Sequence, residues 1–350
     1  MNVEKLLQRA IEVGASDVHL FPQLPPYFRI DGDLHPVSDE ETLTSDMIKT
    51  IVIHLMTVEQ QYTFTEELAI DLSVTVGNVG NFRASIFHEK NGVACVLRIV
   101  PKTIPTFEEL ALPPVLKSLL LVPHGLILVT GTTGSGKSTT LAAMIDYINS
   151  IRAAHIITIE DPIEFSYQNK KSIINQLQVG RDTPSFARAL RASLRQDPDI
   201  ILIGELRDLE TINMALIAAE TGHIVLSTLH ASSTPLAISR IIDVFPATEK
   251  NRIRNLLAES LQAIVCQNLV KRVDKGRIGA FEIMLVNPAI RHYLRQDMIA
   301  HMETVIQTSG DIGMCTLEQS LEQLIVKQLV SPSVVRSLMQ NREIYKSQVR

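Results

Sequence analysis

The chain has 350 residues, of which 45% are hydrophobic and 20% are charged, and its formal net charge is −5. This length favours two domains, and the composition is ordinary for a globular protein. The acidic balance and the lack of tryptophan argue against a nonspecific grip on nucleic acid. The three cysteines form no C-x-x-C pair, which excludes a zinc ribbon and favours a reducing compartment.

The segment 1–14 predicts an amphipathic helix, because Leu6, Leu7, Ala10 and Ile11 recur at helical spacing among charged residues. This charge pattern differs from that of a signal peptide. The sequence also contains no uncharged apolar run of the ~18 residues that a membrane span needs. We therefore expect a cytoplasmic protein that reaches a membrane through a partner.

Residues 1–100 predict a small antiparallel sheet with flanking helices. Turn signals such as Asn91 followed by Gly92 separate β-rich runs there. The predicted strands are 18–20, 27–30, 70–76, 82–88 and 93–100. A proline-rich stretch at 101–114 then predicts a linker. The second domain should span 115–350, where short strands alternate with helices.

Four short apolar runs in the second domain predict buried parallel strands at 126–130, 156–159, 200–203 and 224–227. In open parallel sheets, ligands bind at the carboxyl edge of the strands. The residues that follow these strands should therefore share one edge and form a site. They are the glycine-rich segment 131–138, Glu160 with Asp161, Gly204 with Glu205, and His230.

The segment 131–138 matches the phosphate-loop pattern G-x-x-x-x-G-K-[ST]. Its main-chain N–H groups would surround the β- and γ-phosphates of ATP, Lys137 would contact their oxygens, and Ser138 would ligate Mg²⁺. We expect a helix over 137–149, whose positive N-terminal end would point at the same phosphates. The alternative interpretation is a flexible glycine turn without a ligand, which would need no helix after it. The expected ATP contacts in this loop are Gly131, Thr132, Thr133, Gly134, Ser135, Gly136, Lys137, Ser138 and Thr139.

Two carboxylates at the same edge are candidates for catalysis. Glu205 follows a hydrophobic strand, where an acid would hold Mg²⁺ or polarise the attacking water; capping of the next helix is the alternative. Glu160 could position water or hold a metal-bound water, although a strand-ending turn would also explain it. His230 lies beyond its strand and is a candidate γ-phosphate sensor, whereas His223 at the other end suits a structural role.

Two arginines in the first domain, Arg83 and Arg98, occur in otherwise apolar predicted strands. They are either surface residues or arginine fingers that reach the γ-phosphate held by a neighbouring subunit. The pattern of the residues leaves both interpretations open.

Four segments of the second domain resemble the type IV pilus retraction ATPases of the secretion ATPase family. They are 131–144, similar to the Walker A segment; 159–165, similar to the Asp box; 204–211, similar to the Walker B segment; and 221–230, similar to the His box. The N-terminal segment 14–20 also matches, so the similarity covers almost the whole chain. Thr132 departs from the family pattern, which usually has proline there.

The resemblance implies a PAS-like N-terminal α+β domain, a RecA-like P-loop ATPase domain that ends in a helical region, and a ring-shaped homohexamer. ATP would bind between the domains, with Glu205 as catalytic base and Glu160 assisting at Mg²⁺, partly through water. Arg83 and Arg98 match the family's N-terminal arginine positions, which favours ATP contact for both. The implied function is hydrolysis of ATP to power pilus retraction and twitching motility, in contact with an inner-membrane platform protein and without nucleic acid.

The segment 287–295 looks like the Ala-Ile-Arg motif that pilus retraction requires in this family. Ala289 and Ile290 belong to an apolar stripe, and Arg291 and Arg295 form a basic one beside it. This arrangement favours a coupling helix that docks onto another part of the motor. An ordinary surface helix is the alternative interpretation.

Other functions compete with pilus retraction. Pilus assembly ATPases carry a four-cysteine zinc site, and three scattered cysteines disfavour that class. A retraction-like ATPase of a type IVB secretion system shares all four core segments and stays open. A RecA-type nucleic-acid motor would need a basic track or aromatic platforms, which the composition disfavours.

Overall fold

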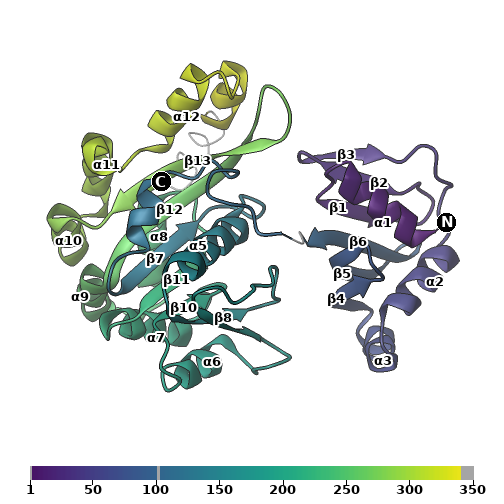
Figure 1. Cartoon of the computed structure of the whole chain (residues 1–350), viewed down its shortest axis with the longest axis horizontal. Coiled ribbons are helices and arrows are strands. Elements are labelled where there is room, and N and C mark those ends of the chain that lie inside the picture. Colours follow the sequence, from purple (N-terminus) through teal and green to yellow (C-terminus); the bar gives the residue numbers. More distant parts are fainter. Residues whose placement is uncertain (1, 101–102, 340–350) are drawn as a thin grey trace. The chain divides into compact units, whose positions relative to one another are not determined.

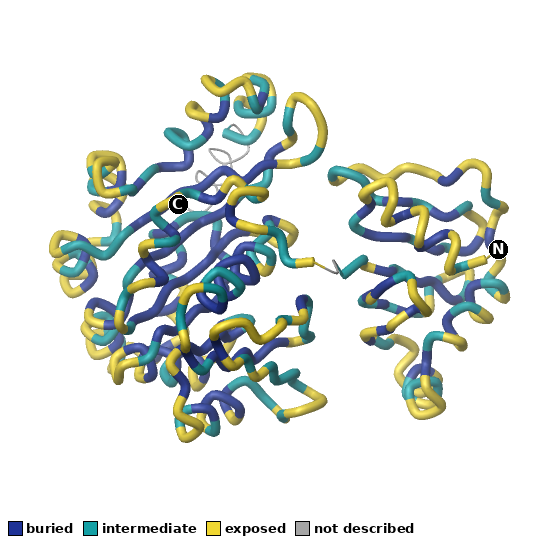
Figure 2. Tube along the Cα trace, in the orientation of Figure 1, coloured by how far each residue is buried: buried dark blue, intermediate teal, exposed yellow. Residues whose placement is uncertain are grey.

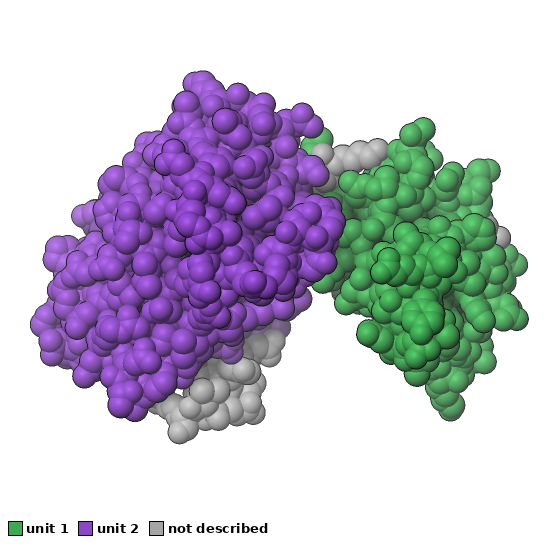
Figure 3. Space-filling view, turned by 90° about the horizontal axis from the view of Figure 1, so that it is seen from below, with its two compact units in different colours: residues 1–103 green, residues 104–350 purple. Residues whose placement is uncertain are grey.

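The computed structural model describes residues 2–100 and 103–339. The chain forms two compact units, Met1–Thr103 and Ile104–Arg350 (Figures 1 and 3). Each unit has its own apolar core, visible as buried segments inside each unit in Figure 2. Within the described ranges, no helix has the length and apolar character needed to cross a bilayer.

The first unit is an antiparallel sheet of six strands with helices packed on one face. Its strands are β1 (Asp17–Leu20), β2 (Tyr27–Ile30), β3 (Asp33–Pro36), β4 (Ala69–Val76), β5 (Gly80–Glu89) and β6 (Gly92–Val100), in the order β3-β2-β1-β6-β5-β4. Its helices are α1 (Val3–Glu12), α2 (Ser45–Leu55) and α3 (Val58–Glu67). Leu6 and Leu7 of α1 are buried with Val18, Phe82 and Leu97 of the strands, as the amphipathic pattern predicts.

The second unit is a mixed sheet of seven strands in the order β13-β12-β7-β11-β10-β8-β9. All neighbours pair in parallel except β12 and β13, which form an antiparallel hairpin. The strands are β7 (Gly125–Thr130), β8 (His155–Glu160), β9 (Ile173–Gln178), β10 (Ile200–Ile203), β11 (Ile224–Leu229), β12 (Leu261–Lys271) and β13 (Arg277–Leu285).

Helices cover both faces of this sheet, because its central strands alternate apolar side chains between two buried layers. Ile127 and Val129 of β7 pack with α4 (Val115–Leu119) and α5 (Lys137–Ile151), whereas Leu126 and Leu128 face the opposite layer. That opposite layer contains α6 (Phe186–Ser193), α7 (Leu209–Glu220), α8 (Thr234–Asp243), α9 (Lys250–Ser260), α10 (Pro288–Arg295) and α11 (Met302–Thr308).

The C-terminal helical region is attached to the hairpin. Leu317 and Leu321 of α12 (Leu317–Val326) are buried against Ile278 and Ala280 of β13. The hydroxyl of Ser320 also accepts a hydrogen bond from the main-chain N–H of Phe281, at 3.0 Å. Two short 3₁₀ turns precede α12: Ile299–His301 lies between α10 and α11, and Gly310–Ile312 lies between α11 and α12.

The nine strands predicted from the sequence are all present, with ends that differ by three residues or fewer. Four further strands, β3, β9, β12 and β13, were not predicted. The edge strand β9 exposes polar side chains, and β12 follows α9 directly with no turn signal between them. Each strand therefore lacks part of the pattern on which strand prediction depends.

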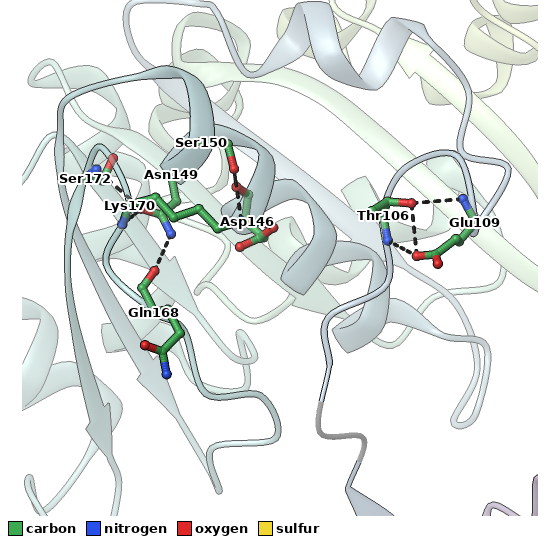
Figure 4. A network of polar contacts seen from close by, with 8 residues as sticks. All are labelled: Thr106, Glu109, Asp146, Asn149, Ser150, Gln168, Lys170 and Ser172. Carbon is green, nitrogen blue, oxygen red and sulfur yellow. Dashed lines mark hydrogen bonds and ion pairs between the residues drawn. The ribbon is translucent and has the colours of Figure 1, made fainter.

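The segment 101–114 differs from a plain connector where the structure describes it; residues 101 and 102 lie outside the described ranges. Phe107 and Leu112 are buried in the core of the second unit. The main-chain N–H and the hydroxyl of Thr106 both donate to a carboxylate oxygen of Glu109, at 2.7 and 3.0 Å (Figure 4). The described part of the segment, residues 103–114, thus contributes to the fold of the second unit.

Candidate nucleotide site

Four neighbouring parallel strands, β7, β11, β10 and β8, end at one edge of the second sheet. Their register pairs Thr130 with Leu229, Ser227 with Ile203, and Ile203 with Ile159. The four segments that follow these strands therefore start at neighbouring positions, as the sequence predicts. This edge is the location where parallel α/β sheets bind ligands.

The phosphate loop connects β7 to α5 and depends on glycine at two positions. Gly131 and Gly136 have φ angles of 145° and 87°, which disfavour any residue with a Cβ. A Cβ on Gly131 would also lie 2.5 Å from the hydroxyl oxygen of Ser135 and 2.4 Å from the main-chain oxygen of Gln267. The turn can therefore close only around glycine.

The remaining loop residues divide into an exposed rim and a buried floor. Thr132, Thr133, Gly134 and Ser138 are exposed, Thr139 is half-buried, and Ser135 is buried. The Ser135 hydroxyl is enclosed without a hydrogen-bond partner in the protein, as is that of Thr130 at the end of β7. Buried polar atoms normally have partners, so these two hydroxyls fit a loop that receives a polar ligand.

Lys137 lies over this loop and shares its surroundings with two carboxylates. Its ammonium donates to the main-chain oxygens of Gly131 and Thr132, at 3.0 and 2.9 Å. Burial lowers the pKa of Lys137, and the negative charges of Glu205 and Glu164 oppose that shift. The structure thus adds Glu164, three residues beyond Asp161, to the charged groups near the predicted ATP phosphates.

Glu205 follows β10 and contacts two basic side chains. One carboxylate oxygen accepts a hydrogen bond from Nε of Arg207, at 2.8 Å, and the other lies 3.4 Å from Nε2 of His230. Main-chain hydrogen bonds hold this segment between β8 and β11. Gly204 donates to Ile159, at 2.7 Å, and Leu206 donates to Thr228, at 3.1 Å.

The structure thus brings together Glu205 and His230, which the sequence placed only on the same edge. Arg207 was not among the predicted site residues, although its position two residues after Glu205 was a usable signal. His223 lies at the other end of β11, where its Nδ1 is 2.9 Å from the main-chain oxygen of Ala218. This contact agrees with the structural role expected for that histidine.

Glu160 ends β8 and is almost completely buried. The hydroxyl of Thr158 and the amide of Gln176 donate to the same carboxylate oxygen, at 2.7 and 3.2 Å. Burial nevertheless raises the pKa of Glu160, because it penalises the charged form more than these hydrogen bonds favour it. Gln176 belongs to β9, a strand that was not predicted, so this partner could not be found from the sequence.

Hydrogen bonds attach residues 168–172, which precede β9, to α5, the helix that starts at the phosphate loop (Figure 4). Asn149 of α5 donates to the main-chain oxygen of Gln168, at 2.7 Å, and accepts from the main-chain N–H groups of Lys170 and Ser172. The ammonium of Lys170 pairs with Asp146, at 2.7 Å. One polar network therefore joins α5 to residues 168–172, which lie between Glu164 and β9.

Arg83 and Arg98 face each other across β5 and β6 of the first unit, and Arg98 is also paired in register with Asp17 of β1. Nε of Arg98 donates to Asp17, at 2.9 Å. Burial alone would raise the pKa of Asp17, but hydrogen bonds from Ser16 and Arg98 lower it below its ordinary value. Both arginines thus belong to the unit without the phosphate loop, and their contact with ATP stays a prediction.

The C-terminal motif forms α10, whose side chains are largely engaged within its own unit. Ile290 and Leu294 are buried in the core, which agrees with the alternative interpretation of the apolar stripe. Arg291 donates to the main-chain oxygen of Ala258, at 2.5 Å, and Arg295 forms an ion pair with Glu259 of α9. Ala289, which precedes these residues, is exposed.

We predict that the substitution Glu160→Gln changes stability in a pH-dependent way. A carboxyl whose pKa is raised in the folded state stabilises the fold below its unfolded pKa and loses that contribution as the pH rises through the folded pKa. The melting temperature of the variant relative to the parent should therefore increase between about pH 4 and pH 7. Thermal unfolding scans without nucleotide test this; a difference that stays flat or decreases with pH would contradict it.

Comparison with known proteins places this geometry in a family. The sequence model of the Type II/IV secretion system protein family (T2SSE) matches residues 1–277. The type IV pilus retraction ATPase PilT of Pseudomonas aeruginosa is 48% identical over 331 residues, which cover 95% of this chain and 96% of that protein. A twitching motility protein of Neisseria gonorrhoeae is 45% identical and covers 91% of this chain and 85% of its own length.

Solved structures give the same result for the fold. The crystal structure of the pilus retraction motor PilT with bound ADP has a TM-score of 0.84 at 43% identity, over 95% of both chains. The ATPase DotB of Legionella pneumophila has a TM-score of 0.85 at 24% identity, over 97% of this chain and 95% of its own, a likeness of fold alone. On the family match and the 48% identity, this chain belongs to the type II/IV secretion system protein family, among the PilT-like pilus retraction ATPases.

Proposed function

We propose that this chain is an ATP-hydrolysing motor subunit that powers type IV pilus retraction and thereby twitching motility. One observation carries the proposal: the phosphate loop, Glu160, Glu205 and His230 follow four adjacent parallel strands at one sheet edge. The likeness to pilus retraction ATPases over 95% of the chain supports the specific process.

Nucleotide binding would start with an exchange of partners at Lys137. In the present structure its ammonium donates to two carbonyls of the loop, and phosphate oxygens would replace them as stronger, charged acceptors. The N–H groups of the loop and the first turn of α5 would surround the same phosphates. Thr132, Thr133 and Ser138 on the exposed rim would complete the ATP contacts.

The residues present also fit Mg²⁺. Within the described residues, no three His, Cys, Asp or Glu side chains form a metal site of their own. Mg²⁺ is commonly held by one or two protein groups together with substrate phosphates and water. The Ser138 hydroxyl and, through water, Glu160 would hold it here. When bound, Mg²⁺ supplies positive charge that offsets the charge developing on the phosphates.

Hydrolysis would depend on Glu205 as the base that accepts a proton from the attacking water. The carboxylate is held by Arg207 and lies near His230 on its other side. We infer that His230 would respond to the γ-phosphate and change the position of the base; its 3.4 Å distance to Glu205 supports this role. The raised pKa of Glu160 suits a group that holds a proton or a metal-bound water next to the reaction.

The assembly around this site is proposed from the family. We infer a cytoplasmic homohexamer, bound peripherally at the inner membrane through the pilus platform protein. Arg83 and Arg98 of the first unit would contact ATP as cationic groups that stabilise the transition state. Nucleic acid has no role in this proposal.

Deletion of the gene in its host tests the cellular function. A strain without a retraction motor should carry more surface pili than the parent and should not twitch. Pili are counted by electron microscopy, and motility is measured on agar. A strain that loses pili altogether would indicate an assembly motor, and one with normal pili and impaired secretion would indicate the type IVB alternative.

Two substitutions should separate binding from hydrolysis. Lys137→Ala removes the charge that would contact the phosphates, so the variant should bind nucleotide weakly and lose turnover. Glu205→Ala leaves the phosphate loop intact, so the variant should bind ATP and lose about 10² to 10⁴ in kcat. Filter binding and phosphate release measure the two quantities. Hydrolysis near the parent rate in either variant would contradict the assigned site.

The coupling helix gives a third prediction for this function. Arg291→Ala with Arg295→Ala should leave hexamers intact and ATPase activity at least partly retained, but abolish retraction in cells. Glu259→Ala is the matched control, because it removes the α9 carboxylate that pairs with Arg295 and leaves both arginines in place. Normal twitching in the double variant, or its loss in the control, would leave α10 a purely structural helix.

A further inference from the structure

Gln267 of β12 places a buried amide side chain beside the phosphate loop. β12 runs parallel to β7, and their last register pair joins Cys266 with Thr130. Gln267 and Gly131 directly follow the two residues of this pair. The strand that contains Gln267 was not predicted from the sequence.

Gln267 makes one hydrogen bond to α5 and lies close to two glycines of the loop. Its carbonyl oxygen accepts a hydrogen bond from the hydroxyl of Thr140 in α5, at 2.7 Å, and both side chains are buried. Its amide nitrogen lies 2.9 Å from the position that a Cβ on Gly136 would occupy. Its main-chain oxygen lies 2.4 Å from the corresponding position on Gly131. Gln267 therefore lies beside both ends of the phosphate loop and beside the first turn of α5.

Burying the amide of Gln267 costs desolvation free energy that an apolar side chain would not. Burying a polar group is unfavourable unless hydrogen bonds replace its contacts with water. The bond to Thr140 satisfies the oxygen of Gln267, and it links β12 to the helix that starts with Lys137. A polar bridge between two buried elements fixes their relative position more specifically than apolar packing does.

We propose that Gln267 is a positioning residue that keeps the phosphate loop in the conformation that binds nucleotide. The inference rests on the proposed ATPase function and adds a residue to it. If the loop adopts the binding conformation only part of the time, the apparent Kd rises in inverse proportion to that fraction. Gln267 acts through Thr140 and the loop glycines, without contact to the reacting atoms.

A double-mutant cycle on the full chain tests this. Gln267→Met keeps the size of the side chain and removes its amide, and Thr140→Val removes the donor from the other side. Each should raise the Kd for a fluorescent ADP analogue, and the loss of one buried hydrogen bond corresponds to roughly three- to tenfold. The double variant should bind as Gln267→Met does, because both changes remove the same link.

Gln262→Met is the matched control. Gln262 lies on the same strand at the opposite end of β7, where its amide donates to the main-chain oxygen of His124, at 3.1 Å, and its side chain borders Gly125. This change should lower the melting temperature without changing Kd, since a purely structural loss acts on stability alone. All Kd values are measured well below the melting temperatures.

Three results would overturn the proposal. They are a Kd within twofold of the parent for Gln267→Met, effects that multiply in the double variant, or an equal rise in Kd for the Gln262→Met control. Failure of the proposed ATPase function looks different, because the parent itself would then neither bind nor hydrolyse ATP. Thr140→Val keeps the test informative if Gln267→Met does not fold.

Discussion

The parallel register of β7, β11, β10 and β8 is the constraint on which the rest of the second unit depends. These strands are buried on both faces, so a shift of one residue would turn their side chains to the wrong layer. The carboxyl ends of the four strands therefore lie at the same edge of the sheet. The polar residues that follow the strands also lie at that edge. Buried apolar packing, rather than attraction among the polar groups, assembles the candidate site.

The charged side chains at that edge already have hydrogen-bond or ion-pair partners within the protein. Glu205 is held by Arg207 and lies near His230, and Lys137 donates to the carbonyls of its own loop. Glu160 is buried with two hydrogen-bond donors, and its pKa is raised. Under the proposed function, an arriving phosphate would replace the carbonyl partners of Lys137 and would lie near the paired Glu205.

The β12–β13 hairpin connects this edge to more distant parts of the unit. Gln267 contacts the start of α5 on one face of β12, and Glu282 of β13 accepts two hydrogen bonds from Thr234, at 2.7 and 2.9 Å, on the other. Thr234 starts α8, directly after the segment that follows His230. The same hairpin also holds α12 through Ser320. Two segments of the candidate site and the C-terminal region are therefore all attached to this hairpin.

The sequence by itself determined the architecture and most of the candidate site. Buried strands show as apolar runs, and the phosphate-loop pattern needs specific residues at fixed spacing, so both are visible locally. Tertiary structure alone decided which groups meet. Gln176, Gln267 and Glu282 come from strands that were not predicted, and their partners lie 16, 127 and 48 positions away along the chain. Such contacts depend on strand order and register, which no local pattern encodes.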